Sequence, residues 1–387
     1  MYSYDEILNQ LRKESLFREL RTIEQIQGPL VRVDDRFIVN FASNDYLGLS
    51  QHPQVKAAAK NAIEEFGTGA GASRLVTGTE LPHTKTEREI AAFKGVDAAL
   101  LFSSGYAAAI GTITAVAGPG DVIILDKLAH ACLIDGAKLS GAALRVFPHN
   151  DIPKLKSHLA WARQTYPSGK ALIVTESVFS MDGGFADLTA IVDLKRKFEA
   201  LLMVDEAHAT GVIGPKGSGW IAALGLTKEV DIQMGTLSKA LGTSGGFICG
   251  SAPLIQLLVN KARSFIYSTA LPPASAAAAS AALEIVRSDE GEMLRTRLLN
   301  NFRLLDQSLS PQSRPKRDAI GPIFPVIIGD EQRALLLAEA LLSQGFLAPA
   351  IRYPSVARGS ARIRIALSSS HSSEQIRSFA EAILASQ

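Results

Sequence analysis

The sequence is poor in cysteine, in long apolar segments and in net charge, and each shortage excludes a class of protein. Its 387 residues include two cysteines, Cys132 and Cys249, far apart and in no paired motif. Neither a disulfide scaffold nor a metal site is therefore expected. No apolar run reaches the roughly 18 residues of a membrane helix, and residues 1–15 lack the order of a signal peptide. We expect a cytoplasmic protein with no membrane partner.

Basic and acidic side chains nearly cancel, since 40 Lys and Arg face 38 Asp and Glu and leave a formal net charge of +2. This balance provides no broad positive field, so nucleic acid is not an expected partner. Hydrophobic residues make up 47% of the chain, which is enough for a large buried core.

Short apolar runs recur along the chain, and each is followed by polar or glycine-rich residues. Most are separated by segments long enough for a helix. Runs apolar on both faces predict strands of a mostly parallel sheet with helices on both sides, hence an α/β fold. The runs cover residues 98–102, 122–125, 144–147, 172–174, 201–204, 231–234 and 246–249.

The two ends of the chain differ from this central part. A helical period over residues 4–23 predicts an N-terminal helix, and the composition becomes charged after Ser288. Beyond that point, 323–328, 333–342, 346–351, 362–367 and 373–384 predict a smaller α/β unit. The predicted parts are an N-terminal helix and arm (1–44), a large domain (45–285) and a small C-terminal domain (286–387).

Ligands of open α/β sheets bind at the carboxyl ends of the strands, so the residues just after each run are informative. The run 201–204 is followed by Asp205 and, three residues later, His208. Asp205 either caps the next helix or pairs with a cationic ring nitrogen, since a buried carboxylate needs a positive partner. A metal pair with His208 is a third reading, and no further ligand cluster supports it.

Lys239 follows the next run and is surrounded by small residues, Thr236 and Ser238 before it and Gly242 after it. A lysine is usually a solvated surface charge. When desolvated, it can lose its proton and form a Schiff base with an aldehyde. Thr236 and Ser238 are suited to bind a phosphate.

Two further strand ends complete the pattern. After 98–102, the turn at Ser103 and Ser104 leads through Gly105 into a predicted helix, whose N-terminus either is simply capped by serine or binds an anion. After 122–125 comes His130, which is suited to cap a helix, to pack in the core or to stack on an aromatic ring. A Schiff-base lysine, a carboxylate, a phosphate site and a stacking histidine are together what pyridoxal 5′-phosphate requires.

Longer stretches resemble the α-oxoamine synthases, a family of fold-type-I pyridoxal-phosphate enzymes that join an amino acid to an acyl thioester with loss of CO₂. The resemblance implies the aspartate-aminotransferase-like fold, with a mostly parallel seven-stranded sheet. The stretches span nearly the whole chain and lie at 44–49, 69–78, 175–184, 204–211, 236–242, 267–273 and 361–364. At Ala109 many relatives carry Asn, for which we expect a small change in packing.

The resemblance assigns a role to each predicted site residue. Lys239 would hold the cofactor, Asp205 would pair with its ring nitrogen, His208 would bond its phenolic oxygen and His130 would stack on the ring. The resemblance also implies a homodimer with shared active sites. The other cofactor-binding residues would be Gly105, Tyr106, Thr236 and Ser180, with Thr269 contacting the phosphate across the dimer interface.

The substrate residues follow from the same resemblance. Asn44 and Arg364 would hold the carboxylate of the amino acid, whereas Arg21, Arg352 and Ser355 would line the acyl pocket. Segment 350–356 is most similar to family members of biotin biosynthesis, which use L-alanine and a pimeloyl thioester. The thioester donor is an acyl-CoA or an acyl-carrier protein. Tyr353 and Ser355 are mild replacements in this segment. Glycine with acetyl- or succinyl-CoA is the alternative. A non-catalytic partner or sensor with the same fold is the competing class, although Lys239 argues against it.

Overall fold

The computed structural model describes residues 3–309 and 321–386 and separates into two compact units. The large unit comprises Leu49–Ser180 and Gly184–Arg295. The small unit comprises the chain up to Gly48, the short segment Met181–Gly183 and the chain from Thr296 onward. The N-terminal residues thus group with the C-terminal part, whereas the sequence-based division used boundaries at 44/45 and 285/286.

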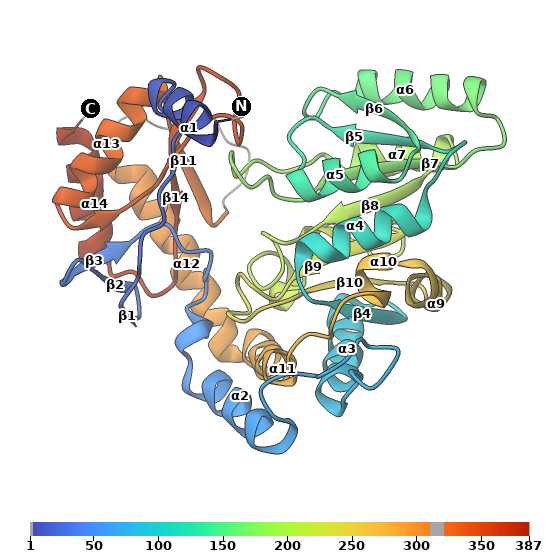
Figure 1. Cartoon of the computed structure of the whole chain (residues 1–387), viewed down its shortest axis with the longest axis horizontal. Helices are drawn as coiled ribbons and strands as arrows, with labels where there is room; N and C mark the ends of the chain where they lie inside the picture. The colour runs from blue at the N-terminus through green and yellow to red at the C-terminus, as the bar shows by residue number, and fades with distance from the viewer. Residues whose placement is uncertain (1–2, 310–320, 387) are drawn as a thin grey trace. The chain divides into compact units, whose positions relative to one another are not determined.

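A seven-stranded sheet forms the centre of the large unit, in the order β4-β10-β9-β8-β7-β5-β6 (Figure 1). Strand β10 is antiparallel to both of its neighbours, and the other pairs are parallel. Each predicted apolar run is a strand, so the α/β prediction is confirmed. The strands are β4 (Ala98–Phe102), β5 (Val122–Asp126), β6 (Ala143–Phe147), β7 (Ala171–Glu176), β8 (Leu201–Asp205), β9 (Ile232–Thr236) and β10 (Gly246–Gly250).

Both faces of this sheet are buried, because successive side chains of a strand point to opposite sides. On β5, Ile123 and Leu125 belong to one apolar cluster, and Val122 and Ile124 belong to the other. The first cluster includes α4 (Gly105–Val116), α5 (Ala131–Leu139), α9 (Ala252–Lys261) and α10 (Arg263–Ile266). The second includes α6 (Ile152–Thr165), α7 (Leu188–Lys197) and α8 (Trp220–Ala223).

Three further helices of the large unit pack together beside strand β4 (Figure 1). Helix α11 (Pro273–Arg287) contacts both α2 (Pro53–Phe66) and α3 (Leu81–Lys94), and α3 contacts β4. Many alanines of α11 are buried, so the helices approach closely. Short 3-10 helices η1 (Leu49–Gln51) and η2 (Pro215–Gly217) lie in the loops, and α12 (Asp289–Ser308) spans the boundary between the units.

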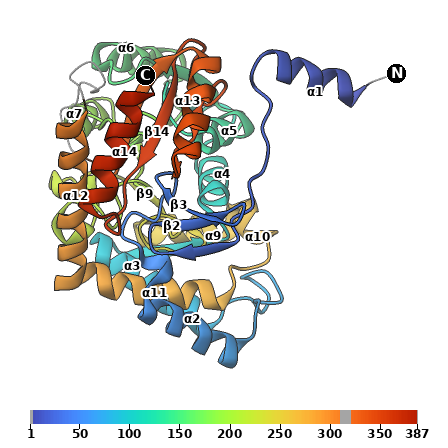
Figure 2. The same ribbon diagram turned by 90° about the vertical axis from the view of Figure 1, so that its left-hand side faces the viewer.

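The small unit contains two sheets (Figure 2). One is antiparallel, with the strand order β11 (Ile323–Gly329), β14 (Ala361–Ala366) and β13 (Ala350–Ile351). Helix α13 (Glu331–Ser343) packs on this sheet, and α14 (Ser373–Ala385) contacts α13. The other contains β1 (Gln25–Gln27), β2 (Leu30–Val33), β3 (Arg36–Asn40) and β12 (Phe346–Leu347). The parallel pairing of β12 with β3 joins the N-terminal chain to the C-terminal chain.

The N-terminal helix is shorter than the sequence predicted. Helix α1 covers Tyr4–Lys13, and the prediction that it reaches residue 23 was wrong. Ser15 adopts a left-handed conformation with φ of 56°, and the amides of Leu16 and Phe17 both bond to the carbonyl of Leu11. This turn ends the helix, so Arg21 does not lie on a helix.

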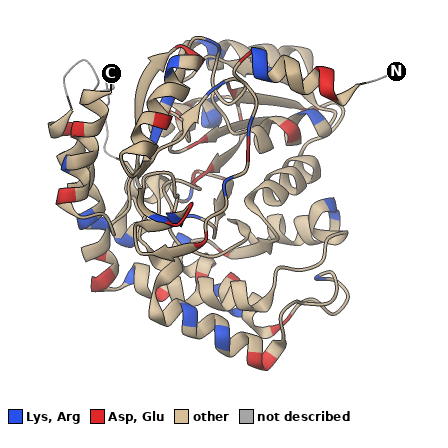
Figure 3. Ribbon diagram, turned by 60° about the vertical axis from the view of Figure 1, so that its left-hand side comes forward, with Lys and Arg blue, Asp and Glu red and all other residues tan. Residues whose placement is uncertain are grey.

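Charged residues of both signs are interspersed along the ribbon (Figure 3), in keeping with the small net charge. Across 3–309 and 321–386, the helices are all too short or too polar to cross a membrane. Within the same ranges, no group of three or more His, Cys, Asp or Glu side chains could hold a metal ion.

Candidate active site

Predicted site residues of the large unit follow the carboxyl ends of neighbouring parallel strands. Asp205 and Thr236 are the last residues of β8 and β9, and His130 is the N-cap of the helix after β5. The ends of parallel strands meet at one edge of the sheet. The structure therefore brings these residues to a common edge, together with Ser180, His208 and Lys239 from the loops that follow β7, β8 and β9.

Lys239 and His208 are in direct contact. The Nζ of Lys239 lies 3.0 Å from the Nε2 of His208, whose side chain is buried. The loop around Lys239 closes on itself, because the amide of Gly242 donates to the carbonyl of Lys239 at 2.9 Å. Gly242 has φ of +66°, and a Cβ there would lie 2.3 Å from the amide nitrogen of Ser50, so glycine is required. The amine is held at a fixed place beside an imidazole.

Asp205 is a buried carboxylate at the end of β8. Its Oδ1 accepts a hydrogen bond from the amide of Ala207 at 2.8 Å, and the residue is 5% exposed. Burial raises the pKa of Asp205, and the positive charge of Lys239 opposes this rise. A further cation at this edge would stabilise the carboxylate, which is the requirement that a protonated ring nitrogen meets.

Hydroxyl groups and a helix N-terminus meet next to β9. The Oγ1 of Thr236 lies 2.7 Å from the Oγ of Ser238 and donates to the carbonyl of Gly245 at 2.8 Å. Helix α4 begins at Gly105, and a Cβ at that position would lie 3.7 Å from Oγ1 of Thr236. The side chain of Ser104 caps the helix by accepting from Ala107. A helix N-terminus beside hydroxyl groups is suited to bind an anion, and the phosphate role of these residues stays a prediction.

Tyr106 and His130 have local partners that the sequence left open. The hydroxyl of Tyr106 donates to Asp135, and this bond raises the pKa of Tyr106. The Nδ1 of His130 accepts from the amide of Cys132 at 3.3 Å, so the histidine does cap α5. His130 as a whole residue is exposed, and its role in stacking on a ring stays a prediction.

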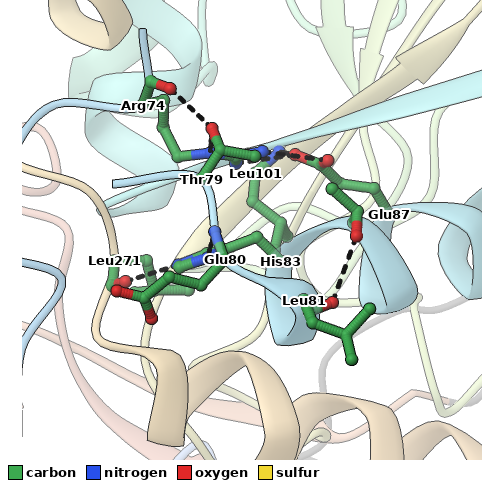
Figure 4. Close-up of polar contacts among 9 residues, drawn as sticks. Arg74, Thr79, Glu80, Leu81, His83, Glu87, Leu101 and Leu271 are labelled. Carbon is green, nitrogen blue, oxygen red and sulfur yellow. Dashed lines mark hydrogen bonds and ion pairs between the residues drawn. The ribbon is translucent and has the colours of Figure 1, made fainter. Parts of the chain in front are cut away.

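Thr269 is exposed, and its segment is hydrogen-bonded to the loop before α3. Ser73 and Thr269 form a β-bridge, and the amide of Ala270 donates to the carbonyl of Ala72. Figure 4 shows the supporting contacts, in which Arg74 makes two hydrogen bonds of 2.8 and 3.0 Å to Glu87. In addition, His83 bonds the carbonyl of Leu271 at 2.6 Å. These buried contacts fix the backbone around Thr269.

In the small unit, Arg364 and Asn44 are brought together. Both terminal nitrogens of Arg364 lie 3.2 Å from Oδ1 of Asn44, and Arg364 is 6% exposed. The hydroxyl of Tyr46 bonds the same oxygen at 3.1 Å. Burial raises the pKa of Tyr46 to about 12, so the phenol stays neutral beside the arginine. A buried guanidinium beside a neutral amide and a neutral phenol is suited to bind a carboxylate ligand.

Arg21 and Arg352 line the same cavity of the small unit, with a volume of about 560 Å³. The guanidinium of Arg352 donates to the carbonyls of Ser15 and Phe17, and its Nε is buried without a partner. Ser355 is exposed, and its amide donates to the carbonyl of Arg352 at 3.0 Å. Arg352 thus anchors the N-terminal segment, a contact that the sequence reading did not foresee.

Glu176 is a site residue that the sequence reading missed. It is paired in register with Asp205 on the adjacent strand, and its Oε1 is buried without a hydrogen-bond partner. Burial, followed by the charge of Asp205, raises the pKa of Glu176 well above the ordinary range. A signal was present, because Glu176 lies two residues after the apolar run 172–174, near the same end of the strand at which Asp205 follows its run.

Comparison with known proteins agrees with this fold. The sequence pattern of the aminotransferase class I and II family matches residues 36–383. Because this match covers most of the chain, the protein belongs to that family.

Individual proteins give a finer comparison. The chain is 46% identical over 364 residues to the 8-amino-7-oxononanoate synthase of Geobacter sulfurreducens, covering 94% of this chain and 92% of the relative. It is 45% identical over 371 residues to the synthase of the same name from Citrifermentans bemidjiense, covering 96% and 94%. Among solved structures, a serine palmitoyltransferase variant of S. paucimobilis with a bound PLP–myriocin compound superposes with a TM-score of 0.93 at 29% identity, covering 99% of this chain and 96% of that one.

Proposed function

We propose that this chain is a pyridoxal-phosphate-dependent acyltransferase that condenses L-alanine with a pimeloyl thioester to give 8-amino-7-oxononanoate, CO₂ and a free thiol, in biotin biosynthesis. The observation that carries the proposal is the Lys239 amine, 3.0 Å from His208, at a sheet edge that also bears the buried carboxylate Asp205. The names of nearly full-length relatives support the particular reaction.

The residues present fit pyridoxal phosphate. Asp205 has a pKa raised by burial, which a ring-nitrogen cation would relieve, and the start of α4 next to Thr236 offers amides and hydroxyls to a phosphate. Lys239 supplies the amine for an aldehyde. Once bound, the cofactor supplies an electron sink for the pair of electrons left when a bond to the substrate Cα breaks.

The residues of the chain itself move and hold protons. Lys239, whose amine contacts His208, is the group that would take the proton from the alanine Cα and later return one. The new bond joins that carbon to the thioester carbonyl, the thiol leaves, and the alanine carboxyl departs as CO₂. Arg364 and Asn44 hold the amino-acid carboxylate, because they form a preassembled cation and amide pair.

The acyl substrate is assigned to the cavity lined by Arg21 and Arg352, and Ser355 follows Arg352 by three residues. The same cavity is also lined by acidic residues, so the two arginines are the groups there that can attract a carboxylate: the acidic residues are Glu19, Glu24, Asp34 and Glu339. A pimeloyl chain ends in a second carboxylate, and arginine is the side chain best suited to bind it, since it stays charged and donates two parallel bonds. The donor is either pimeloyl-CoA or a pimeloyl carrier protein.

The working form is proposed to be a cytoplasmic homodimer with shared active sites. Support for the dimer comes from exposed apolar side chains near Thr269, namely Leu75, Val76 and Tyr267, of which Val76 and Tyr267 are 74% and 72% exposed. A second copy that buried these side chains would place Thr269 at the interface. Both cysteines are free and buried, as suits a reducing compartment.

A substrate panel tests the proposed function. Purified protein loaded with pyridoxal phosphate is given alanine or glycine with acetyl-, succinyl- and pimeloyl-CoA, and kcat/KM is measured for each pair. Alanine with pimeloyl-CoA should give the highest value. A preference for glycine with acetyl- or succinyl-CoA would support another α-oxoamine synthase instead, and binding of the cofactor without turnover of any pair would support a non-catalytic role.

A further inference from the structure

A buried ion pair involves the residue that follows Asp205 at the end of β8. Lys94, the last residue of α3, and Glu206, which follows Asp205, have their charged atoms 2.7 Å apart. Their side chains are 1% and 0% exposed. Removing two charges from water costs free energy even when they are paired, so a buried ion pair does not by itself indicate a gain in folding stability.

The ion pair is fully hydrogen-bonded. Besides Glu206, the ammonium group of Lys94 donates to the hydroxyl of Thr210 at 3.0 Å and to the carbonyl of Ser218 at 2.8 Å, so that its three donors are used. The other oxygen of Glu206 accepts from the amide of Ile221 at 2.9 Å. The chain makes room for this carboxylate at Gly219, which has φ of +116° and where a Cβ would lie 2.1 Å from Oε2 of Glu206.

The backbone of Glu206 belongs to the segment that carries the site. Its amide donates to the carbonyl of Met234 on β9, and its carbonyl accepts from the amides of Ala209 and Thr210. Asp205 precedes it and His208 is two residues later. The ion pair therefore attaches the Asp205–His208 segment to α3 and to the loop at 218–221.

The charges of the pair also act on the site. Glu206 is one of the groups that raise the pKa of Asp205, after burial, which is the largest cause. The other titratable groups that interact with Asp205 are Lys239, His130, Cys132 of α5 and, from the neighbouring strand, Glu176. Cys249 of β10 faces the ion pair itself. Without Lys94, the negative charge of Glu206 would act on Asp205 uncompensated.

We propose that the Lys94–Glu206 ion pair is a positioning device of the cofactor site, which fixes the Asp205–His208 segment and cancels a negative charge so that Asp205 stays ionised to hold a cationic ring nitrogen. This inference rests on the cofactor site of the proposed function and is independent of which amino acid and thioester react. The competing explanation is that the pair serves folding only.

The test uses the sign of a pH shift. Apoprotein is titrated with pyridoxal phosphate at a series of pH values, and absorbance gives the dissociation constant and the acidic midpoint at which affinity is lost. Lys94→Met leaves Glu206 uncompensated and should move this midpoint up by about one pH unit. Glu206→Gln leaves Lys94 uncompensated and should move it down. The double variant K94M/E206Q has neither charge and should return close to the wild-type midpoint.

The control is Lys195→Met, which breaks a partly buried ion pair with Asp231 just before β9, at the amino end of that strand. It should lower the melting temperature without a shift of the midpoint. If both single variants melt early but keep the wild-type midpoint, or shift it in the same direction, the pair serves folding only and the inference is wrong. If Lys94→Met does not fold, the sign found for Glu206→Gln decides in the same way. A wild type that binds no pyridoxal phosphate would overturn the proposed function itself.

Discussion

Glu176 and Asp205 are partners on adjacent parallel strands, and both carboxyl groups are buried at the same sheet edge. Two negative charges so close together in a buried place repel each other, and the group with the weaker compensation holds its proton. Lys239 and backbone hydrogen bonds lower the pKa of both carboxyl groups, from Ala207 to Asp205 and from His130 and Ser180 to Glu176. Burial and the charge of Asp205 nevertheless raise the pKa of Glu176 well above its ordinary range. We therefore expect Glu176 to be the neutral member of the pair.

Glu176→Gln should make the apoprotein more stable at pH 8 by about 1 kcal/mol and have little effect near pH 4. The folded-state pKa of Glu176 is raised, so its contribution to stability is complete below the unfolded value and is lost as the pH rises. Urea denaturation at the two pH values measures the difference. Glu64→Gln, at an exposed position of α2, is the matched control. Equal destabilisation at both pH values would show that Glu176 is not held neutral.

Asp205→Asn should leave the fold intact and reduce kcat by at least a hundredfold. The asparagine oxygen can still accept from the amide of Ala207, but the negative charge that would hold the ring-nitrogen proton is gone. Circular dichroism, the visible absorbance of bound cofactor and steady-state kinetics give the three readings. The control is Asp97→Asn, at an exposed site before β4. Near-normal kcat with cofactor bound would remove Asp205 from its assigned role.

Arg352→Ala should raise the KM for the pimeloyl thioester roughly ten- to a hundredfold and spare alanine binding, because a charge-assisted contact contributes about 1.5–3 kcal/mol. The same change frees the carbonyls of Ser15 and Phe17. Arg358→Ala is the control for a loosened N-terminal segment, since it breaks the ion pair with Glu14, together with the contact of Arg358 with the ring of Tyr353. Loss of alanine binding with unchanged thioester affinity would mean that the roles of Arg352 and Arg364 are exchanged.

His371 gives the small unit a stability that depends on pH. Its Nδ1 accepts from the amide of Ser368 and its Nε2 donates to the carbonyl of Asn40, and burial lowers the pKa of His371 from 6.5 to about 4. Because the folded-state value is lowered, the contribution is present above pH 6.5 and is lost as the pH falls to 4. It amounts to about 3 kcal/mol. His371→Gln, measured by denaturation between these pH values, should flatten the dependence, and an unchanged slope would contradict the assignment.

Sequence periodicity located the central strands because each one lies between two apolar layers. The run 98–102, for example, coincides with β4, and the polar residues after the runs marked the sheet edge that bears Asp205 and Lys239. The central sheet and the edge at which these residues lie were therefore predictable from local patterns.

Other features depend on partners far along the chain. The helical period of residues 4–23 does not reveal the left-handed turn at Ser15. Nor does it reveal the hydrogen bond that Arg352, 337 residues away, donates to the carbonyl of Ser15. Strand β1 is exposed throughout and carries no alternating pattern. The bond between Lys94 and Glu206 joins residues 112 positions apart, so neither residue is conspicuous in the sequence.

The central claim is a decarboxylative condensation that depends on Lys239, and isotope tracing tests it most directly. Wild-type protein with bound pyridoxal phosphate is incubated with pimeloyl-CoA and alanine labelled with ¹³C either at the carboxyl or at the methyl carbon. The account predicts one labelled CO₂ for each free thiol from the first substrate, and an aminoketone that keeps the label from the second. Lys239→Ala should form neither product, whereas Lys56→Ala, on the exposed side of α2, should form both. Thiol release without CO₂, or turnover that survives in Lys239→Ala, would contradict the account.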